Sequence, residues 1–450
     1  MLPSQHNFYL GLLLMFLESI LCTWGLSGTD NIFSYFISLN AILIYCVTAY
    51  SKESSNLLLH RFLKYVLFFL IIICFIQYFN YNIKIDTFEG YTDLKYVDFV
   101  KWLPTSVLGE YYKGNALKSL FEIGATIGIA IASLTMFCNQ KALRCVLIFL
   151  GVNTALMGIY AIIQDELDFP IIYNYFYTTA SFYGSFPLSN AAGAFLNIGC
   201  AINFSLAVGM LKKRKFFFSV LWFSFALICS VSSYMSQSEG ARLFCIFFWL
   251  IVLPLSFYKV VSKFYSKTTA TISILMAAFL VGLVAYLFIN SNAETLVKKY
   301  ENVAKNLNES ASSRFFMYKL SSDIISKNPI FGSGGKSCQY LLTEEMIKSR
   351  DSNKGSLASS TYHAHSDPLE YLMEFGIVGA FFICLSMAFW IWNFYKSSPD
   401  FESWILFIGA LICLLHSCFD MHLHILSTMI VFAVVASACL FTAPKQGTLK

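Results

Sequence analysis

Residues 362–379 read YHAHSDPLEYLMEFGIVG and join a polar loop with two histidines to an apolar helix. Asp367 offers a helix cap, Pro368 suits the first helical position, and Glu370 places an acid in the first turn. A helix is therefore predicted to begin just after His365 and to continue into a run of apolar residues. The start of a helix carries partial positive charge and free amide donors, which favour an anion and a neutral imidazole. A neutral imidazole beside an anion site suits general-base chemistry.

The composition is that of a membrane protein. The chain has 450 residues, of which 57% are hydrophobic, 17% aromatic and only 13% charged, and its mean hydropathy is +0.63. Water-soluble domains of this length do not combine these values. Apolar runs long enough to cross the hydrocarbon core as helices recur throughout, and the alternation that a membrane β-barrel needs is absent. We predict an all-α, polytopic bundle of about twelve transmembrane helices, near 8–24, 32–50, 62–80, 119–137, 146–164, 191–210, 216–235, 241–258, 268–289, 377–394, 404–420 and 425–442.

The basic residues of the short loops predict the orientation of the bundle. They fall on one side, which the positive-inside rule makes cytoplasmic, together with both termini. The first span lacks a small-residue cleavage pattern and is expected to be retained. The net charge of +5 mostly reflects this topology, and without a basic patch interleaved with aromatics, nucleic acid is not an expected partner. The basic residues on this side are Lys52, Arg61, Lys64, Lys141, Arg144, Lys212, Lys213, Arg214, Lys215, Lys259, Lys263, Lys267, Lys445 and Lys450.

Two segments on the opposite side interrupt the first nine predicted helices. Residues 81–118 mix charges with aromatics and are expected to form a loop on the membrane surface. Residues 165–190 are rich in Tyr, Phe, Ser, Gly and Pro, and Pro187, Ser189 and Asn190 offer a turn and a cap before the next span. This second segment is interpreted either as a mouth at the outer interface or as an aromatic belt.

A third segment, residues 290–375, holds most of the extramembrane mass and is predicted to be helical, between helices nine and ten. An apolar stripe at three- and four-residue spacing predicts one amphipathic helix, and a second is predicted over 313–327, ended by Asn328 and Pro329. The glycine-rich turn GSGGKS and the polar run DSNKGSLASS follow. The stripe consists of Leu296, Tyr300, Val303 and Leu307. The expected domains are 1–289 for helices one to nine, 290–375 for this segment, and 376–450 for helices ten to twelve with a cytoplasmic tail.

Metal and nucleotide chemistry are less favoured by the sequence. His-x-His pairs can ligate a metal from a loop, but neither pair here has the i, i+4 spacing of a helical zinc motif. GGKS falls short of a phosphate loop, because Ile330 stands where a glycine is needed. The 13 cysteines contain no CxxC pair, which argues against a zinc knuckle or a disulfide framework. We expect no metal and no cofactor, and the alternative metal ligands are His363, His365, Asp367, Asp420, His422 and His424.

Taken together, the motif HS-x9-GIVG at 365–379 resembles the signature of the O-antigen ligase and polymerase superfamily, C-type glycosyltransferases of the bacterial inner membrane. The stretch 312–335 is similar to that family's arginine-containing helix with its Asn/His-Pro and Gly-rich turn, and 184–196 resembles its Gly-x-Phe-x3-Asn segment. The resemblance implies about twelve helices interrupted, between the ninth and tenth, by a large periplasmic segment that carries the histidine. The first hundred residues show no motif of this family.

The resemblance also implies an activity and roles for named residues. It implies inverting transfer of a glycan from undecaprenyl diphosphate to an acceptor hydroxyl, without a metal or a nucleotide sugar. His365 would accept the proton of the acceptor, while Arg314 and Arg242 would stabilise charge on the departing diphosphate. SQSEGAR departs from the family's Ser-x-Ser-Arg-Gly-Ala, because Glu239 takes the place of the arginine; Arg242, one turn later, either replaces that charge or only pairs with Glu239. Residues expected to contact substrate are His363, Ser366, Asn190, Glu239 and Lys336.

The acceptor is the open question within this family. We favour a ligase that uses lipid A core, because the histidine motif matches that subgroup, with a polysaccharide polymerase or a protein O-oligosaccharyltransferase as alternatives. From another class, a polysaccharide flippase would need polar groups near the bilayer midplane. The polar groups gather instead at one predicted face, and Glu18 is the main charge predicted within the membrane.

Overall fold

The computed structural model describes residues 3–25, 32–49, 57–88, 91–109, 115–167, 182–261, 314–352 and 363–441. The chain forms two compact units, one from Met1–Cys245 with Leu320–Lys450 and the other from Ile246–Lys319. The predicted span near 268–289, the stripe beginning at Leu296 and most of the polar run after 350 lie outside the described residues.

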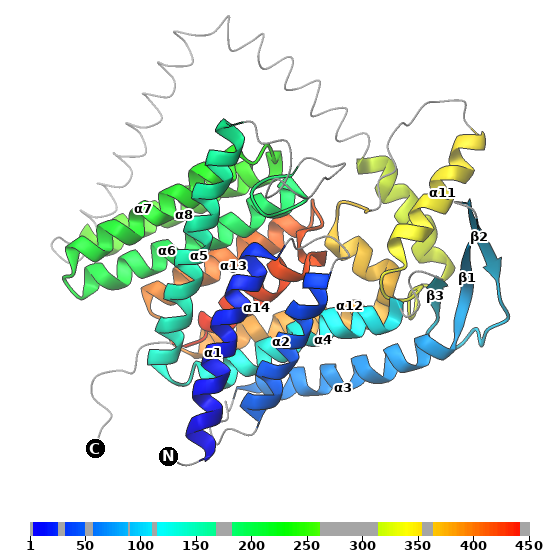
Figure 1. The fold of residues 1–450 in the computed structure, drawn as a ribbon, viewed down its shortest axis with the longest axis horizontal. Helices are drawn as coiled ribbons and strands as arrows, with labels where there is room; N and C mark the ends of the chain where they lie inside the picture. Colours follow the sequence, from blue (N-terminus) through cyan, green and yellow to red (C-terminus); the bar gives the residue numbers. More distant parts are fainter. Residues whose placement is uncertain are drawn as a thin grey trace, which may run out of the picture. The chain divides into compact units, whose positions relative to one another are not determined.

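The described part of the chain is mainly helical (Figure 1). Eight of its helices are long and apolar enough to cross a membrane, and three shorter apolar helices accompany them. These helices overlap eleven of the predicted apolar runs, which confirms a multi-pass helical membrane protein. The helices are α1 (Pro3–Trp24), α2 (Ile32–Ala49), α3 (Leu58–Phe79), α4 (Asn115–Met136), α5 (Gln140–Glu166), α6 (Ser189–Lys212), α7 (Phe216–Met235), α8 (Glu239–Val261), α11 (Cys338–Ser352), α12 (Asp367–Lys396), α13 (Phe401–Ser417), the short 3-10 helix η1 (His422–His424) and α14 (Leu426–Ala438). A further helix covers 314–327, as predicted.

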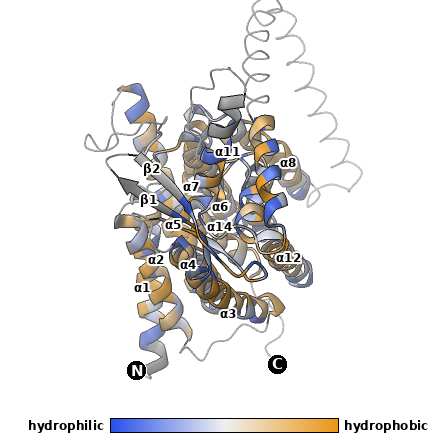
Figure 2. Ribbon diagram, turned by 90° about the vertical axis from the view of Figure 1, so that its right-hand side faces the viewer, coloured by the Kyte–Doolittle hydropathy of each residue, from blue (hydrophilic) through white to orange (hydrophobic). Residues whose placement is uncertain are grey.

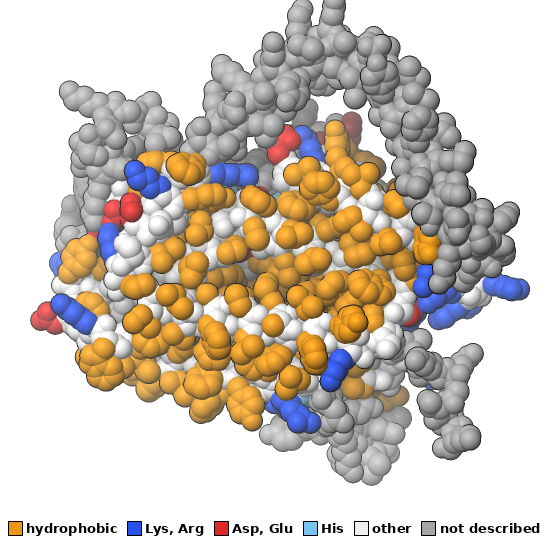
Figure 3. Space-filling view, turned by 180° about the vertical axis from the view of Figure 1, so that it is seen from behind, with side chains coloured by type: hydrophobic (Ala, Val, Ile, Leu, Met, Phe, Trp, Pro, Cys, Tyr) orange, Lys and Arg blue, Asp and Glu red, His pale blue; other side chains and the backbone are white. Residues whose placement is uncertain are grey.

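Hydrophobic side chains cover the outward faces of the bundle helices. Figure 2 shows hydrophobic residues along α3, α4 and α12, and in Figure 3 one face is almost wholly hydrophobic with Lys and Arg at its margins. Phe75 of α3 and Phe217 of α7 are 64% and 76% exposed. So much exposed apolar surface is unfavourable in water and is explained by contact with lipid.

A small sheet corrects the prediction of an all-α chain. The segment expected to be a loop contains β1 (Tyr81–Phe88), β2 (Tyr91–Tyr96) and β3 (Ser106–Gly109), in the order β2-β1-β3. β1 pairs antiparallel with β2 and parallel with β3. The alternation of apolar and polar residues in YNIKID is the period of a half-buried strand, and the mixed charge of the segment masked it.

The sheet packs against α11 (Figure 1). Ile83 and Val107 are buried, and Tyr340 and Leu341 of α11 pack on them. The hydroxyl of Tyr96 donates a hydrogen bond to Glu344 of α11 at 2.7 Å. Strands and helix thus form a layer at the end of the bundle where α12 begins.

α12 is broken at Gly376, where the backbone adopts φ 61° and ψ −161°. Only glycine populates this region readily. The break frees carbonyl groups before it and amides after it, and such groups must find partners where water is scarce. The segment 329–334 supplies these partners: Ser333 N–H donates to Met373 O (2.7 Å), Gly334 N–H to Glu374 O (2.9 Å), Ile377 N–H to Pro329 O (2.9 Å) and Val378 N–H to Ile330 O (3.1 Å).

The glycines of GSGGKS allow this close approach. A Cβ at Gly332 would collide with the backbone of Glu374, and one at Gly334 would lie 2.6 Å from the Cα of Ser106. A Cβ at Gly335 would collide with the hydroxyl of Ser119 in α4. The turn is therefore packed between α12, β3 and α4, in contrast to the flexible turn expected from the sequence.

Charged residues gather at the N-terminal end of α13. Arg144 of α5 pairs with Glu402, and Lys212 of α6 lies 3.0 Å from Asp400. Gly209 leaves room for this group, because a Cβ there would collide with Glu402. At 1.5 Å per residue, the 17 residues of α13 separate this end from the other by about 25 Å, close to the thickness of the hydrocarbon core.

Replacing Gly376 by Ala should destabilise the fold strongly. The substitution combines a conformation that is essentially confined to glycine with a collision against the carbonyl of Ile330, and we expect a loss of about 3 kcal/mol or more. Gly124→Ala in α4 is the matched control, because its Cβ would make ordinary contacts at 3.6 Å with Leu67 of α3 and at 3.7 Å with Leu120. Thermal unfolding in detergent measures both variants, and equal stabilities would contradict the proposed constraint at Gly376.

Candidate functional site

His365 and Asp420 form the centre of the candidate site. His365 has a positive φ of 53°, a conformation that non-glycine residues rarely adopt. Its Nδ1 lies 3.6 Å from Oδ1 of Asp420, in the turn that links α13 to η1. Burial alone would raise the pKa of the Asp420 carboxyl, but the nearby imidazoles of His365, His416 and His422 lower that pKa below its usual range. Asp420 is therefore a carboxylate at neutral pH.

The Asp420 side chain and backbone are both held in place. Its Oδ1 accepts a hydrogen bond from the Met421 N–H at 2.9 Å, and its carbonyl accepts one from the Asp367 N–H at 3.1 Å. Nε2 of His416, at the end of α13, lies 3.9 Å from Oδ2. Asp420 is only 1% exposed, so these contacts fix the carboxylate that faces His365.

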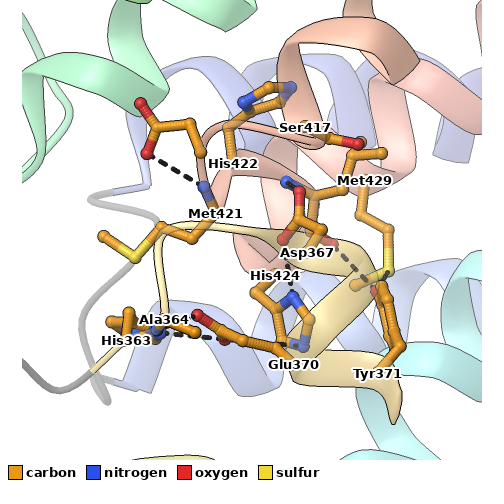
Figure 4. A network of polar contacts seen from close by, with 12 residues as sticks. His363, Ala364, Asp367, Glu370, Tyr371, Ser417, Met421, His422, His424 and Met429 are labelled. Atoms are coloured by element: carbon orange, nitrogen blue, oxygen red, sulfur yellow. Dashed lines mark hydrogen bonds and ion pairs between the residues drawn. The ribbon is translucent and has the colours of Figure 1, made fainter. Parts of the chain in front are cut away.

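The start of α12 differs from the prediction by one residue. Ser366 is the N-cap residue and makes no side-chain capping bond, whereas Asp367, expected as the cap, is the first helical residue. The Asp367 carboxylate accepts the Leu423 N–H at 2.9 Å and lies 2.6 Å from Nδ1 of His424 (Figure 4). A partner 57 residues away therefore replaces the local capping bond.

Glu370 holds the backbone and ring that precede His365. Its carboxylate accepts the Ala364 N–H at 2.8 Å and lies 3.1 Å from Nδ1 of His363 (Figure 4). Ala364 is fully buried, while the His363 side chain is 34% exposed. The loop from His363 to His365 is thus fixed from within, with part of the His363 ring accessible.

The start of α8 packs closely against His416 at Gly240. A Cβ at Gly240 would collide with the ring of His416, and the ring of Phe244 stacks on His416 with centroids 4.9 Å apart. Beside Gly240, Arg242 forms the expected ion pair with Glu239 at 3.2 Å. Arg242 also donates to the Tyr234 carbonyl at 2.7 Å and lies 5.1 Å from the centroid of the Tyr234 ring.

Two further predicted site residues, Arg314 and Asn190, lie on other helices. Arg314, half-buried, is the first described residue of the 314–327 helix and belongs to the unit Ile246–Lys319, so its approach to His365 stays a prediction. Asn190 is the second residue of α6 and is half-buried. The N-cap residue of α6 is Leu188, so the predicted cap by Ser189 or Asn190 is wrong.

The chain just before α6 is buried in the fold. Tyr183 and Phe186 are 4% and 1% exposed, and the Phe186 ring packs on Phe195 at 4.9 Å. The hydroxyl of Ser185 donates to the carbonyl of Thr23 in α1. This part of the 165–190 segment therefore forms neither a mouth nor a belt; residues 168–181 lie outside the described residues.

Lys336 has an internal partner. Its ammonium lies 2.6 Å from the Glu122 carboxylate of α4, and the two side chains are 24% and 9% exposed. The pair joins the glycine-rich turn to the bundle, so the structure gives Lys336 a structural contact in addition to the predicted contact with substrate.

The sequence did not reveal how His416, Asp420 and His424 are used. Near the outer end of a predicted span, Asp420 and His416 were only candidates to support the site from behind its reacting groups, and Asp420, His422 and His424 were alternative metal ligands. His365, which faces Asp420, and Asp367, which faces His424, lie 55 and 57 residues away in the chain, beyond the reach of a local pattern. Among the residues that the structure describes, no three His, Cys, Asp or Glu side chains are placed to hold a metal ion.

Part of the chain matches a known protein family. The sequence model described as O-antigen ligase matches residues 225–384, from α7 to the middle of α12. This match supports the resemblance of the chain to the O-antigen ligase superfamily. The matched region includes Arg242, Arg314 and His365, whereas Asp420 and His424 lie beyond it. No curated protein matches the chain.

Replacing Lys336 by Met should test whether its role is structural. The substitution leaves the Glu122 carboxylate largely buried without its cation, and we expect a loss of about 2 to 3 kcal/mol, below the value for a fully buried pair because Lys336 is partly exposed. The double variant with Glu122→Gln should recover most of this loss in thermal unfolding. A wild-type melting temperature for Lys336→Met would leave substrate contact as its only role.

Proposed function

We propose that this protein is an O-antigen ligase-like glycosyltransferase that moves a glycan from undecaprenyl diphosphate to the hydroxyl of lipid A core. The observation that carries the proposal is the His365–Asp420 pair within a chain that resembles this superfamily. A carboxylate on one ring nitrogen orients an imidazole and stabilises the positive charge that forms when the other nitrogen accepts a proton. We assign proton acceptance to Nε2, because Nδ1 faces Asp420.

The reaction is a single displacement that inverts the anomeric centre. The acceptor oxygen attacks the anomeric carbon as the bond from that carbon to the diphosphate oxygen breaks on the opposite face. The acceptor proton passes to His365, and the electron pair of the broken bond leaves with undecaprenyl diphosphate. No metal, nucleotide or other cofactor takes part in this scheme, because the leaving group is already a diphosphate.

Arginine side chains would stabilise the leaving diphosphate. A guanidinium keeps its charge near lipid and offers two parallel donors to phosphate oxygens. Arg314 is the first candidate, on the family's arginine-containing helix. Arg242 is the second, because the start of its helix touches His416 beside Asp420. Glu239, 66% exposed and bound to Arg242, would control the direction in which that guanidinium points.

The other proposed substrate contacts are His363, Ser366, Asn190 and Lys336. The partly accessible His363 ring next to the candidate base is the best placed of these. Ser366 is 4% exposed, so its contribution would come through the position of the helix start. The proposed partners are the lipid-linked donor, the acceptor and membrane lipid.

We also propose that the site faces the periplasm, in a bundle of twelve spans in the bacterial inner membrane. Support comes from α13, which has Asp400 and Glu402 with their basic partners at its start and the His416–Asp420 group after its end. Because cytoplasmic loops are rich in Lys and Arg, the basic end is assigned to the cytoplasm. The 290–375 segment would then be periplasmic.

A purified assay with a lipid diphosphate glycan and candidate acceptors tests the chemistry. His365→Ala should lower the rate by about 10³-fold or more and Asp420→Asn by at least about 10²-fold, because the base and its orienting group act together. His6→Ala, at an exposed position in α1, is the control. Product formation should persist with a chelator; chelator-sensitive transfer, or full activity of His365→Ala, would contradict the mechanism.

Surface glycans of a deletion strain should separate the acceptors. A ligase predicts full-length glycan that is made but remains unattached to lipid A core. Attachment of single repeats to core would indicate a polymerase, and normal core glycans with an unmodified glycoprotein would indicate a protein O-oligosaccharyltransferase. Glycan profiles by gel electrophoresis distinguish these three results.

A further inference from the structure

His424 is a buried histidine that the proposed mechanism does not use. His424, the last residue of η1, has a side chain that is only 5% exposed. Its Nδ1 lies 2.6 Å from Asp367, and its Nε2 lies 3.7 Å from both Glu370 and Glu374. Figure 4 shows the ring between Asp367 and Glu370, with Tyr371 alongside. Three carboxylates from one helix thus surround a single imidazole.

The spacing of these carboxylates explains the arrangement. Asp367, Glu370 and Glu374 are separated by three and four residues, so they project from one face of the first two turns of α12. The Tyr371 ring covers the imidazole with centroids 4.2 Å apart, and its hydroxyl donates to the Leu423 carbonyl at 3.0 Å. His424 is therefore held by the same helix that begins beside His365.

The surroundings favour the charged form of the ring. Burial lowers the pKa of His424, but the carboxylates of Glu370, Asp367 and Glu374 outweigh that effect and raise its pKa from 6.5 to about 10. An imidazolium between three acidic side chains balances part of their charge, which an apolar residue at this position would leave uncompensated.

Asp367 connects this cation to the candidate base. One of its oxygens faces His424 and the other accepts the Leu423 N–H, while its own N–H donates to the Asp420 carbonyl. We propose that His424 is a positioning residue that clamps the 420–424 turn onto the start of α12 and thereby holds Asp420 against His365. The proposal rests on the proposed function for its catalytic consequence, but the clamp itself is a property of the fold.

Stability as a function of pH tests the clamp without any assay of transfer. Because the pKa of His424 is raised on folding, its stabilising contribution is complete below pH 6.5 and is lost as the pH rises toward 10. The ionisable groups that face it are Asp367, Glu370, Tyr371 and Glu374 of α12, and His422 of its own turn acts on Asp367.

The wild-type melting temperature in detergent should therefore fall between pH 7 and pH 10 by at least about 3 °C more than that of His424→Gln. His60→Gln is the matched control, because His60 is also buried and lies 3.2 Å from the hydroxyl of Thr135 of α4. This control should keep the pH-dependent fall. A wild-type protein without any such fall would overturn the clamp, even if the glutamine variant cannot be purified.

Kinetics then test the positioning role. His424→Gln and Asp367→Asn should each lower kcat roughly 10²-fold with little change in KM, since a small misplacement of a catalytic group has this effect. The double variant should be no slower than the slower single variant, because both residues act through one contact. Multiplied losses in the double variant, or an unchanged kcat in both singles, would refute positioning.

The two sets of measurements separate failure of the clamp from failure of the function. If His365→Ala transfers glycan normally while the pH-dependent fall in stability is present, the proposed function is wrong and the clamp stands. If His365→Ala is inactive but His424→Gln matches wild type in both kcat and pH-dependent stability, the function stands and the clamp is wrong.

Discussion

The backbone pairing between the broken helix α12 and the segment 329–334 is the constraint on which the site depends. Gly376 interrupts the helix, and four hydrogen bonds from a segment about 45 residues earlier replace the missing helical ones. Unpaired peptide groups are energetically costly away from water. The break in α12 therefore requires the 329–334 segment, and that segment requires the break. The turn also carries Lys336 to Glu122 and leads into α11, which supports the sheet. The break in α12 thereby connects the helical bundle, the layer formed by the sheet and α11, and the loop from His363 to His365.

The polar side chains at the start of α12 and in the 416–424 segment form two sets. Asp420, His416 and His365 form a set open to chemistry, whereas Asp367, Glu370, Glu374 and His424 form a set that is buried and largely satisfied. The two sets touch where the Asp367 N–H meets the Asp420 carbonyl. Polar networks of this kind rigidify a structure only when their members are paired. The set around His424 supports the set around His365, which suits a reaction that requires fixed positions.

Local patterns predicted the helices well and the contacts between distant segments poorly. Apolar length and loop charge belong to contiguous residues, so the spans, the basic end and the 314–327 helix were accessible to sequence analysis. The strand period in β1 was also visible, although the surrounding charges led to the prediction of a loop. The capping bond expected at Asp367 was wrong because Leu423 and His424, far along the chain, compete for its carboxylate. His365 was identified by its motif, but nothing near it in the sequence indicates Asp420.

Because α12 breaks at Gly376, the nine residues between Ser366 and that glycine determine the length and rotation of the first part of the helix. The length from serine to glycine sets the distance between the start of the helix and its break, about 15 Å for ten helical steps. It also sets a rotational phase, because each residue turns the helix by about 100°. One residue inserted or removed would swing the three acidic side chains of α12 away from the 420–424 turn while leaving every apolar span unchanged. The number of residues in HS-x9-GIVG thus sets both the rotation of the helix and the distance between its start and its break.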